Sequence, residues 1–115
     1  MAIRIIRTPI TRSELAEIAS EEFGDVVKVV VDVRQGIMAV GGELHADEEV
    51  LLTEEAGSVR EDTWGINLYP QQEEDWVEFD SMINLKPSLG NRSRGVENAE
   101  IRGKILAVIE RLILS

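Results

Sequence analysis

The stretch VVKVVVDV, residues 26–33, consists mainly of β-branched valines and predicts a buried β-strand. Side chains alternate along a strand, so Lys28 and Asp32 lie on one side and the other side is formed by Val27, Val29, Val31 and Val33. A turn over residues 34–36 leads into a second predicted strand over residues 37–44. Gly41-Gly42 within that strand indicates a bulge or a close backbone approach.

A helix is predicted on each side of this pair of strands. Thr11 and Glu14 have the spacing of a capping box, and Ile10 and Leu15 have that of a hydrophobic staple, so we expect a helix that ends at Gly24. A second helix follows Asn98, and its broad apolar stripe is formed by Ile101, Ile105, Val108, Ile109 and Leu112.

A short strand is predicted over residues 3–6, and further strands over residues 63–70 and 77–85, where apolar and polar residues alternate. Residues 48–55 fit a short helix or a strand, and we favour the strand because the apolar run is short. The order predicts a single α+β domain over residues 1–115, with one mainly antiparallel sheet covered on one face by two helices. The other face would expose Asn67, Asp80 and Asn84 to solvent or a partner.

The chain of 115 residues carries a net charge of −10, which disfavours binding to nucleic acid and to anionic membranes. Residues 43–80 hold thirteen acidic side chains and one basic side chain, whereas residues 81–115 hold three acidic and six basic side chains. This asymmetry favours a protein partner or a salt-sensitive homo-oligomer. The absence of cysteine excludes disulfides and thiolate catalysis. No stretch has the pattern of a signal peptide or a membrane span, so we expect a cytoplasmic protein.

The loop KPSLGNRSRGVE, residues 86–97, is the first candidate site. Glycine-rich backbone can form an anion-binding nest, and arginine forks bind phosphate or carboxylate. We therefore expect an anionic small molecule or a protein partner to bind here through Asn91, Arg92, Ser93 and Arg94. The loop lacks the spacings of nucleotide-binding motifs, so the sequence does not identify a cofactor. In the alternative interpretation, the two arginines pair with carboxylates from residues 43–80.

Glu43, His45 and Asp47 are the second candidate site, and His45 is the only histidine. In a strand these side chains share a face with neighbours roughly 6.5–7 Å apart. They are candidates for a general base or for two ligands of a metal, although no metal site is assigned because a third ligand, such as Glu78 or Asp80, must come from elsewhere. In the alternative interpretation, His45 hydrogen-bonds to the backbone.

These residues leave a second function open, a small hydrolase-like enzyme. His45 with Glu43 or Asp47 would act as base or metal site, while Arg92 and Arg94 hold an anionic substrate. It requires His45 and the loop to share one pocket. A serine triad has weak support, because no GxSxG turn is present.

Three strings occur together in this chain: MAVGGELHADEE at residues 38–49, DTWGINLYP at 62–70 and INLKPSLGNRSRGVE at 83–97. As a set they resemble a family of short bacterial and archaeal proteins catalogued as a domain of unknown function. The resemblance covers nearly the whole chain. It implies no activity, cofactor or catalytic residue.

Overall fold

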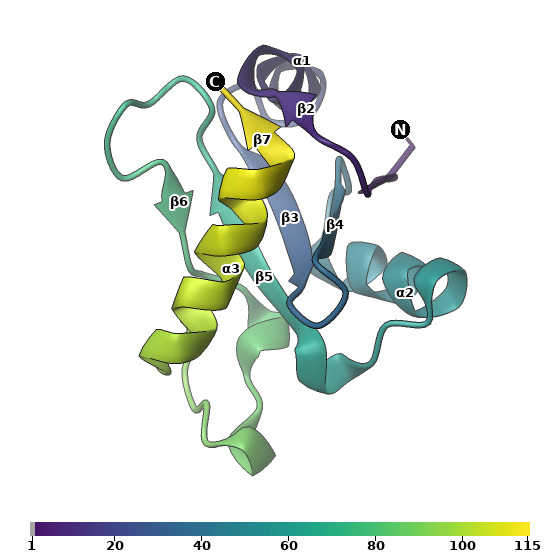
Figure 1. Cartoon of the computed structure of the whole chain (residues 1–115), viewed down its shortest axis with the longest axis vertical. Coiled ribbons are helices and arrows are strands. Elements are labelled where there is room, and N and C mark those ends of the chain that lie inside the picture. The colour runs from purple at the N-terminus through teal and green to yellow at the C-terminus, as the bar shows by residue number, and fades with distance from the viewer. Residues whose placement is uncertain (1) are drawn as a thin grey trace.

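The computed structural model describes residues 2–115 and is organised around a five-stranded antiparallel sheet (Figure 1). The strand order is β1-β4-β3-β5-β6, with bounds β1 Arg4–Ile6, β3 Val27–Asp32, β4 Ile37–Val40, β5 Thr63–Leu68 and β6 Val77–Glu78. The valine-rich stretch is the central strand, in which Val29 pairs with Val40 on one side and with Ile66 on the other. The α+β class and the antiparallel main sheet are confirmed.

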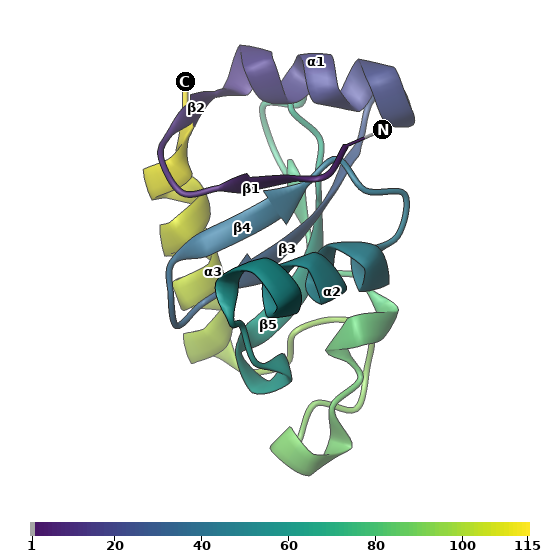
Figure 2. The same cartoon turned by 90° about the vertical axis from the view of Figure 1, so that its right-hand side faces the viewer.

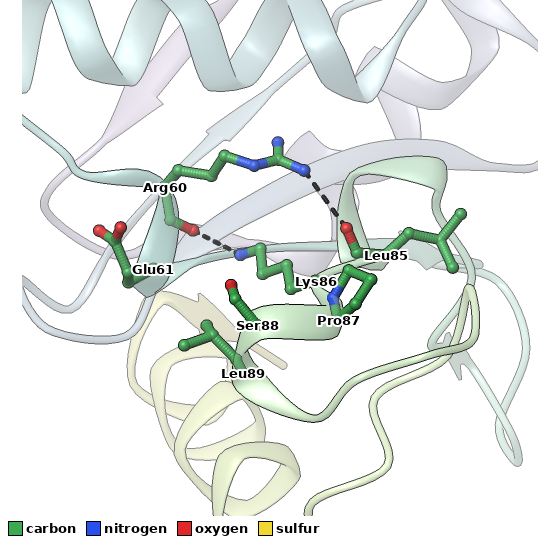
Figure 3. A pocket seen from close by; sticks show the side chains of 7 residues that line it. All are labelled: Arg60, Glu61, Leu85, Lys86, Pro87, Ser88 and Leu89. Carbon is green, nitrogen blue, oxygen red and sulfur yellow. Dashed lines mark hydrogen bonds between the residues drawn. The ribbon is translucent and has the colours of Figure 1, made fainter.

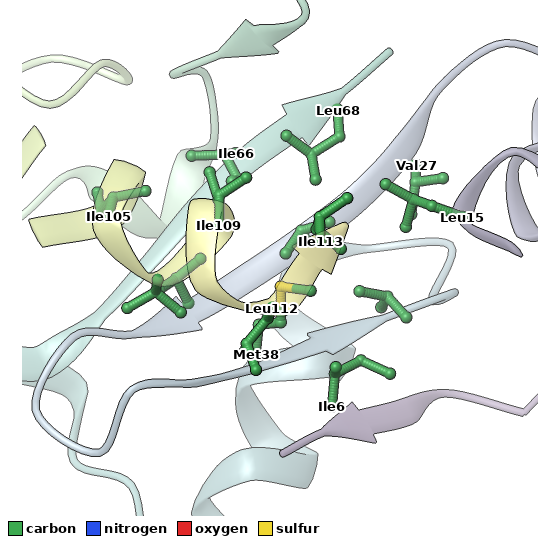
Figure 4. Packing of buried hydrophobic residues seen from close by; sticks show 14 of the residues in the cluster. Ile6, Leu15, Val27, Met38, Ile66, Leu68, Ile105, Ile109, Leu112 and Ile113 are labelled. Atoms are coloured by element: carbon green, nitrogen blue, oxygen red, sulfur yellow. The ribbon is translucent and has the colours of Figure 1, made fainter. Parts of the chain in front are cut away.

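Two helices, α1 (Arg12–Glu22) and α3 (Ala99–Leu112), cover one face of the sheet, as expected (Figure 1). The Thr11 hydroxyl accepts a hydrogen bond from the Glu14 amide at 3.0 Å, which confirms the predicted cap of α1. Short parallel strands β2 (Ile10–Thr11) and β7 (Ile113–Leu114) join the start of α1 to the end of α3. Figure 4 shows the core between these helices and the sheet, which includes Leu15, Met38, Ile66, Ile105 and Leu112.

A third helix, α2 (His45–Ala56), covers the opposite face (Figure 2), so the strand favoured for residues 48–55 is wrong. Gly57 ends the helix with φ of 68°, a conformation that favours glycine. The face beneath is apolar at Val30 and Ala39, and α2 buries it with Leu52. A strand covered on both faces shows a continuous apolar run, which is why the central strand is valine-rich.

The strand predicted over residues 77–85 is confirmed only at Val77–Glu78, because a 3-10 turn, η2 (Met82–Asn84), follows it. The Asn84 side chain takes the place of a neighbouring strand at Gly65, donating to its carbonyl at 2.9 Å and accepting from its amide at 2.8 Å. Asn84 is fully buried, so the prediction that it faces solvent is also wrong. Two more 3-10 turns, η1 (Arg60–Asp62) and η3 (Pro87–Leu89), lie near this segment. Over residues 2–115, no helix is both long and apolar enough to span a bilayer.

Candidate functional site

The loop of residues 86–97 is held from within by Asn91, which is 4% exposed. Its amide group donates to the carbonyls of Asn84 and Gly95 at 2.7 and 2.8 Å, and to that of Ser93 at 3.2 Å. Its carbonyl oxygen accepts from the Glu97 amide at 2.8 Å. Asn91 therefore uses its hydrogen-bonding capacity to shape the loop.

The two arginines of the loop differ in their partners. Arg94 forms an ion pair with Asp80 at 2.7 Å, so the alternative interpretation, pairing with the acidic middle of the chain, is confirmed for this residue. The exposed Arg92 guanidinium forms no ion pair within residues 2–115. The Ser93 hydroxyl accepts from the Gly95 amide at 3.2 Å. Of the four residues predicted to bind a ligand, Arg92 has the side chain that these internal contacts leave free.

His45 is the first residue of α2, so the strand expected through it is wrong. The side chain is buried, and Nε2 lies 2.8 Å from the Ile66 carbonyl oxygen. A carbonyl can only accept, so Nε2 carries the proton in this contact. Burial lowers the His45 pKa and favours the neutral ring.

Glu43 and Asp47 are exposed and line a cavity of about 150 Å³ next to Gly41 and Gly42. Within residues 2–115, no group of three or more metal-ligating side chains is arranged to hold a metal ion. The three residues of the second candidate site are therefore close in sequence but differ in environment, with His45 packed beneath the helix and the two acids at the surface.

A different cavity, of about 190 Å³, lies between η1 and η3 (Figure 3). It is lined by Arg60, Glu61, Leu85, Lys86, Pro87, Ser88 and Leu89. We call it the Arg60–Lys86 cavity. Four of its seven lining residues come from the loop predicted to bind a ligand, but from residues 86–89 rather than 91–94.

Lys86 is the unusual member of this lining, because a lysine only 4% exposed is rare. Its ammonium donates to the carbonyl of Arg60 at 2.5 Å and to that of Thr63, and it lies 4.1 Å from the centre of the Trp64 ring. Burial lowers the Lys86 pKa from 10.5 to about 8, although nearby Glu49 partly offsets that effect. Lys86 therefore stays charged at neutral pH, although removing its ammonium from water is unfavourable.

Arg60 lies at the edge of the same cavity and is held by Glu49, whose Oε1 is 3.2 Å from its Nη1. The other oxygen of Glu49 accepts from the Thr63 hydroxyl at 2.6 Å. Sequence reasoning missed Arg60 and Lys86 as a pair. The available signal was that Arg60 is the only basic residue in the acidic middle of the chain.

Comparison with known proteins gives a family but no characterised relative. No curated protein and no solved structure matches the chain. A family model described as a protein of unknown function, DUF5674, matches residues 4–112. Because this match spans nearly the whole chain, the protein belongs to the DUF5674 family, which confirms the resemblance to a family of unknown function.

Proposed function

We propose that this protein is a binding module for a small anion, a carboxylate or a phosphate, which occupies the Arg60–Lys86 cavity. The observation that carries the proposal is the environment of Lys86. Its partners are two carbonyls and an indole ring, and no carboxylate within residues 2–115 forms an ion pair with it. Buried charges are normally paired with an opposite charge. An anion in the cavity would supply that charge.

The size and charge of the cavity support a small ligand. Its volume of about 190 Å³ is below the roughly 300–1,000 Å³ of sites for drug-sized molecules. Arg60, at the edge, has a planar fork suited to carboxylate and phosphate oxygens. Glu61 is the one acidic residue in the lining, against two basic ones, so the local charge favours an anion in spite of the acidic chain.

Tryptophan fluorescence tests this proposal at the site itself. The Trp64 ring lies beneath the Lys86 ammonium, whereas the Trp76 ring lies 4.0 Å from the Arg12 guanidinium. In a Trp76→Phe background, titration with acetate or phosphate at constant ionic strength should change the Trp64 emission. Thermal unfolding should shift upward as well, because a ligand at a hundred times its dissociation constant stabilises the folded state by about 2.7 kcal/mol.

Substitutions and pH locate the site. Arg60→Gln and Lys86→Met should weaken anion binding. Arg34→Gln is the matched control, because Arg34 also forms an ion pair, with Asp62 at 3.0 Å, but does not line the cavity, so this variant should bind the anion as the wild type does. Affinity should fall as the pH rises through about 8, where Lys86 loses its charge. An unchanged titration in both Arg60→Gln and Lys86→Met would refute the proposal.

A further inference from the structure

A second cavity, of about 220 Å³, also has Leu89 in its lining. Its lining consists of Trp64, Leu89, Gly90, Asn91, Glu97, Asn98 and Ile101. Two features place it next to the Arg60–Lys86 cavity. Leu89 lines both cavities, and Lys86 of the first contacts the Trp64 ring of the second at 4.1 Å. We call it the Trp64 cavity.

The indole of Trp64 has an unused hydrogen-bond donor. Trp64 is 1% exposed, and its Nε1 has no hydrogen-bond partner within residues 2–115. An indole N–H can only donate, and a buried donor without an acceptor is unfavourable. A ligand group that accepts a hydrogen bond would remove this deficit.

Glu97 determines which kind of acceptor fits. Its carboxylate accepts from the Arg92 amide at 2.7 Å, and this hydrogen bond lowers the Glu97 pKa, so the group is ionised at neutral pH. An ionised carboxylate in the lining repels a second anion but accepts readily from an N–H. Leu89 and Ile101 add apolar walls. An uncharged amide, with one acceptor and one donor, meets these conditions.

We propose that the two cavities bind one ligand, in which a single saturated carbon joins a free carboxylate to the nitrogen of an amide. The carboxylate occupies the Arg60–Lys86 cavity, and the amide carbonyl accepts from Trp64 Nε1. A ligand with these two groups so close together suits two cavities that share Leu89 in their linings. This chemistry is that of an N-acyl amino acid or the C-terminal residue of a peptide. The inference rests on the proposed anion site.

The test compares acetate, N-acetylglycine and N-acetylglycinamide by NMR. The chain has two tryptophans, so two indole N–H signals are expected, and Trp76→Phe assigns the signal of Trp64. N-acetylglycine should bind roughly 3- to 10-fold more tightly than acetate, the gain expected from one added hydrogen bond, and should shift the Trp64 indole signal downfield. N-acetylglycinamide, without the carboxylate, should bind more weakly than N-acetylglycine.

The outcomes separate this inference from the proposed function. Suppose that acetate binds, that N-acetylglycine binds no more tightly than acetate, and that both compounds give the same position of the Trp64 indole signal. The inference is then overturned, and the anion site stands. If none of the three compounds binds, the inference is overturned, and if phosphate fails to bind as well, the anion site is overturned with it.

Two variants test the amide contacts separately. Trp64→Phe keeps an aromatic ring but removes the N–H, and should lower the preference for N-acetylglycine over acetate. Should that variant fail to fold, the exposed Glu97→Gln tests the second contact and should lower the same preference, with Glu100→Gln on the exposed side of α3 as control. An unchanged preference in Glu97→Gln and in a folded Trp64→Phe would overturn the inference.

A longer acetylated peptide distinguishes the two sources of the ligand. If a tripeptide with a free carboxylate binds more tightly than N-acetylglycine, the ligand is a peptide C-terminus, and equal affinities indicate an N-acyl amino acid. A tripeptide amide that binds as tightly as the free acid would overturn the inference.

Discussion

The two faces of the central sheet are covered in different ways. The face beneath α1 and α3 is apolar nearly throughout, whereas the face beneath α2 has a small apolar cluster formed by Val30, Ile37, Ala39, Leu52 and Ile83. The same side of the sheet also buries several polar side chains, among them those of His45, Glu48, Ser81 and Asn84. The first face provides most of the hydrophobic free energy. The second uses directional hydrogen bonds to fix the segments that lead into the loop of residues 86–97.

A leucine-to-alanine substitution on each face should show the difference in hydrophobic stabilisation most strongly. Leu112 belongs to the large cluster and Leu52 to the small one, and neither is exposed. We expect Leu112→Ala to lower the free energy of unfolding by about 3–5 kcal/mol and Leu52→Ala by about 2–3 kcal/mol, because the smaller cluster can relax around the cavity. Urea unfolding measures both values. A larger loss for Leu52→Ala would mean that the α2 face is the main core.

Asn84→Asp should have the next largest effect. The aspartate keeps an acceptor for the Gly65 amide but loses the donors to the carbonyls of Gly65 and Arg94, at 2.9 and 2.8 Å. We expect a loss of about 2–4 kcal/mol in urea unfolding, from two missing hydrogen bonds and a buried acid.

Asn98→Asp is the matched control for that substitution. Asn98 caps α3 with its oxygen alone, accepting from the Ile101 amide at 3.0 Å, so an aspartate should serve equally well. A similar loss of stability in both variants would show that the donors of Asn84 contribute little.

This difference between the faces also explains which parts of the fold the sequence could predict. The valine strand, the Thr11 cap and the stripe of α3 are local patterns, and all three are confirmed. The helical state of residues 48–55 depends on an apolar sheet face that only the assembled structure creates. The turn at Met82–Asn84 depends on a hydrogen bond pair with Gly65, nineteen residues away.

The candidate site was predictable only as a segment. Composition pointed to the loop of residues 86–97, and its first residues line the Arg60–Lys86 cavity. Arg92 and Arg94 were predicted to bind a ligand because charged side chains in a glycine-rich loop are typical of an anion site. Lys86 became a candidate only through its burial against Trp64, which no local pattern encodes.

Glu48→Gln should have a smaller effect, and one that depends on pH. Glu48 lies in α2 and is fully buried; its Oε2 accepts from the Gly42 amide at 2.9 Å, and its Oε1 has no hydrogen-bond partner within residues 2–115. Burial raises its pKa well above 4.5, although the charge of Lys28 partly offsets this. The folded protein thus retains a proton that the unfolded chain loses, so the stability from this group is complete below pH 4.5 and is lost as the pH rises through the folded-state pKa.

Glutamine keeps the acceptor for Gly42 and cannot ionise, so the variant should lose less stability than the wild type as the pH rises. Urea midpoints across the pH range measure this, and the exposed Glu54→Gln on the same helix should follow the wild type. Parallel pH profiles for Glu48→Gln and the wild type would show that Glu48 ionises normally.

The smallest effects on stability are expected for substitutions of the two loop arginines. Arg94 forms an ion pair with Asp80, whereas Arg92 forms none within residues 2–115. Arg94 and Asp80 are 56% and 43% exposed, so solvent and salt screen their attraction, and Arg94→Gln should cost less than about 1 kcal/mol, with the loss shrinking at high salt. Arg92→Gln should change stability by less than about 0.5 kcal/mol, because its guanidinium forms no ion pair within residues 2–115. If instead Arg92→Gln costs more than Arg94→Gln in low-salt urea unfolding, the free arginine contributes to the fold, and the distinction between the two side chains is wrong.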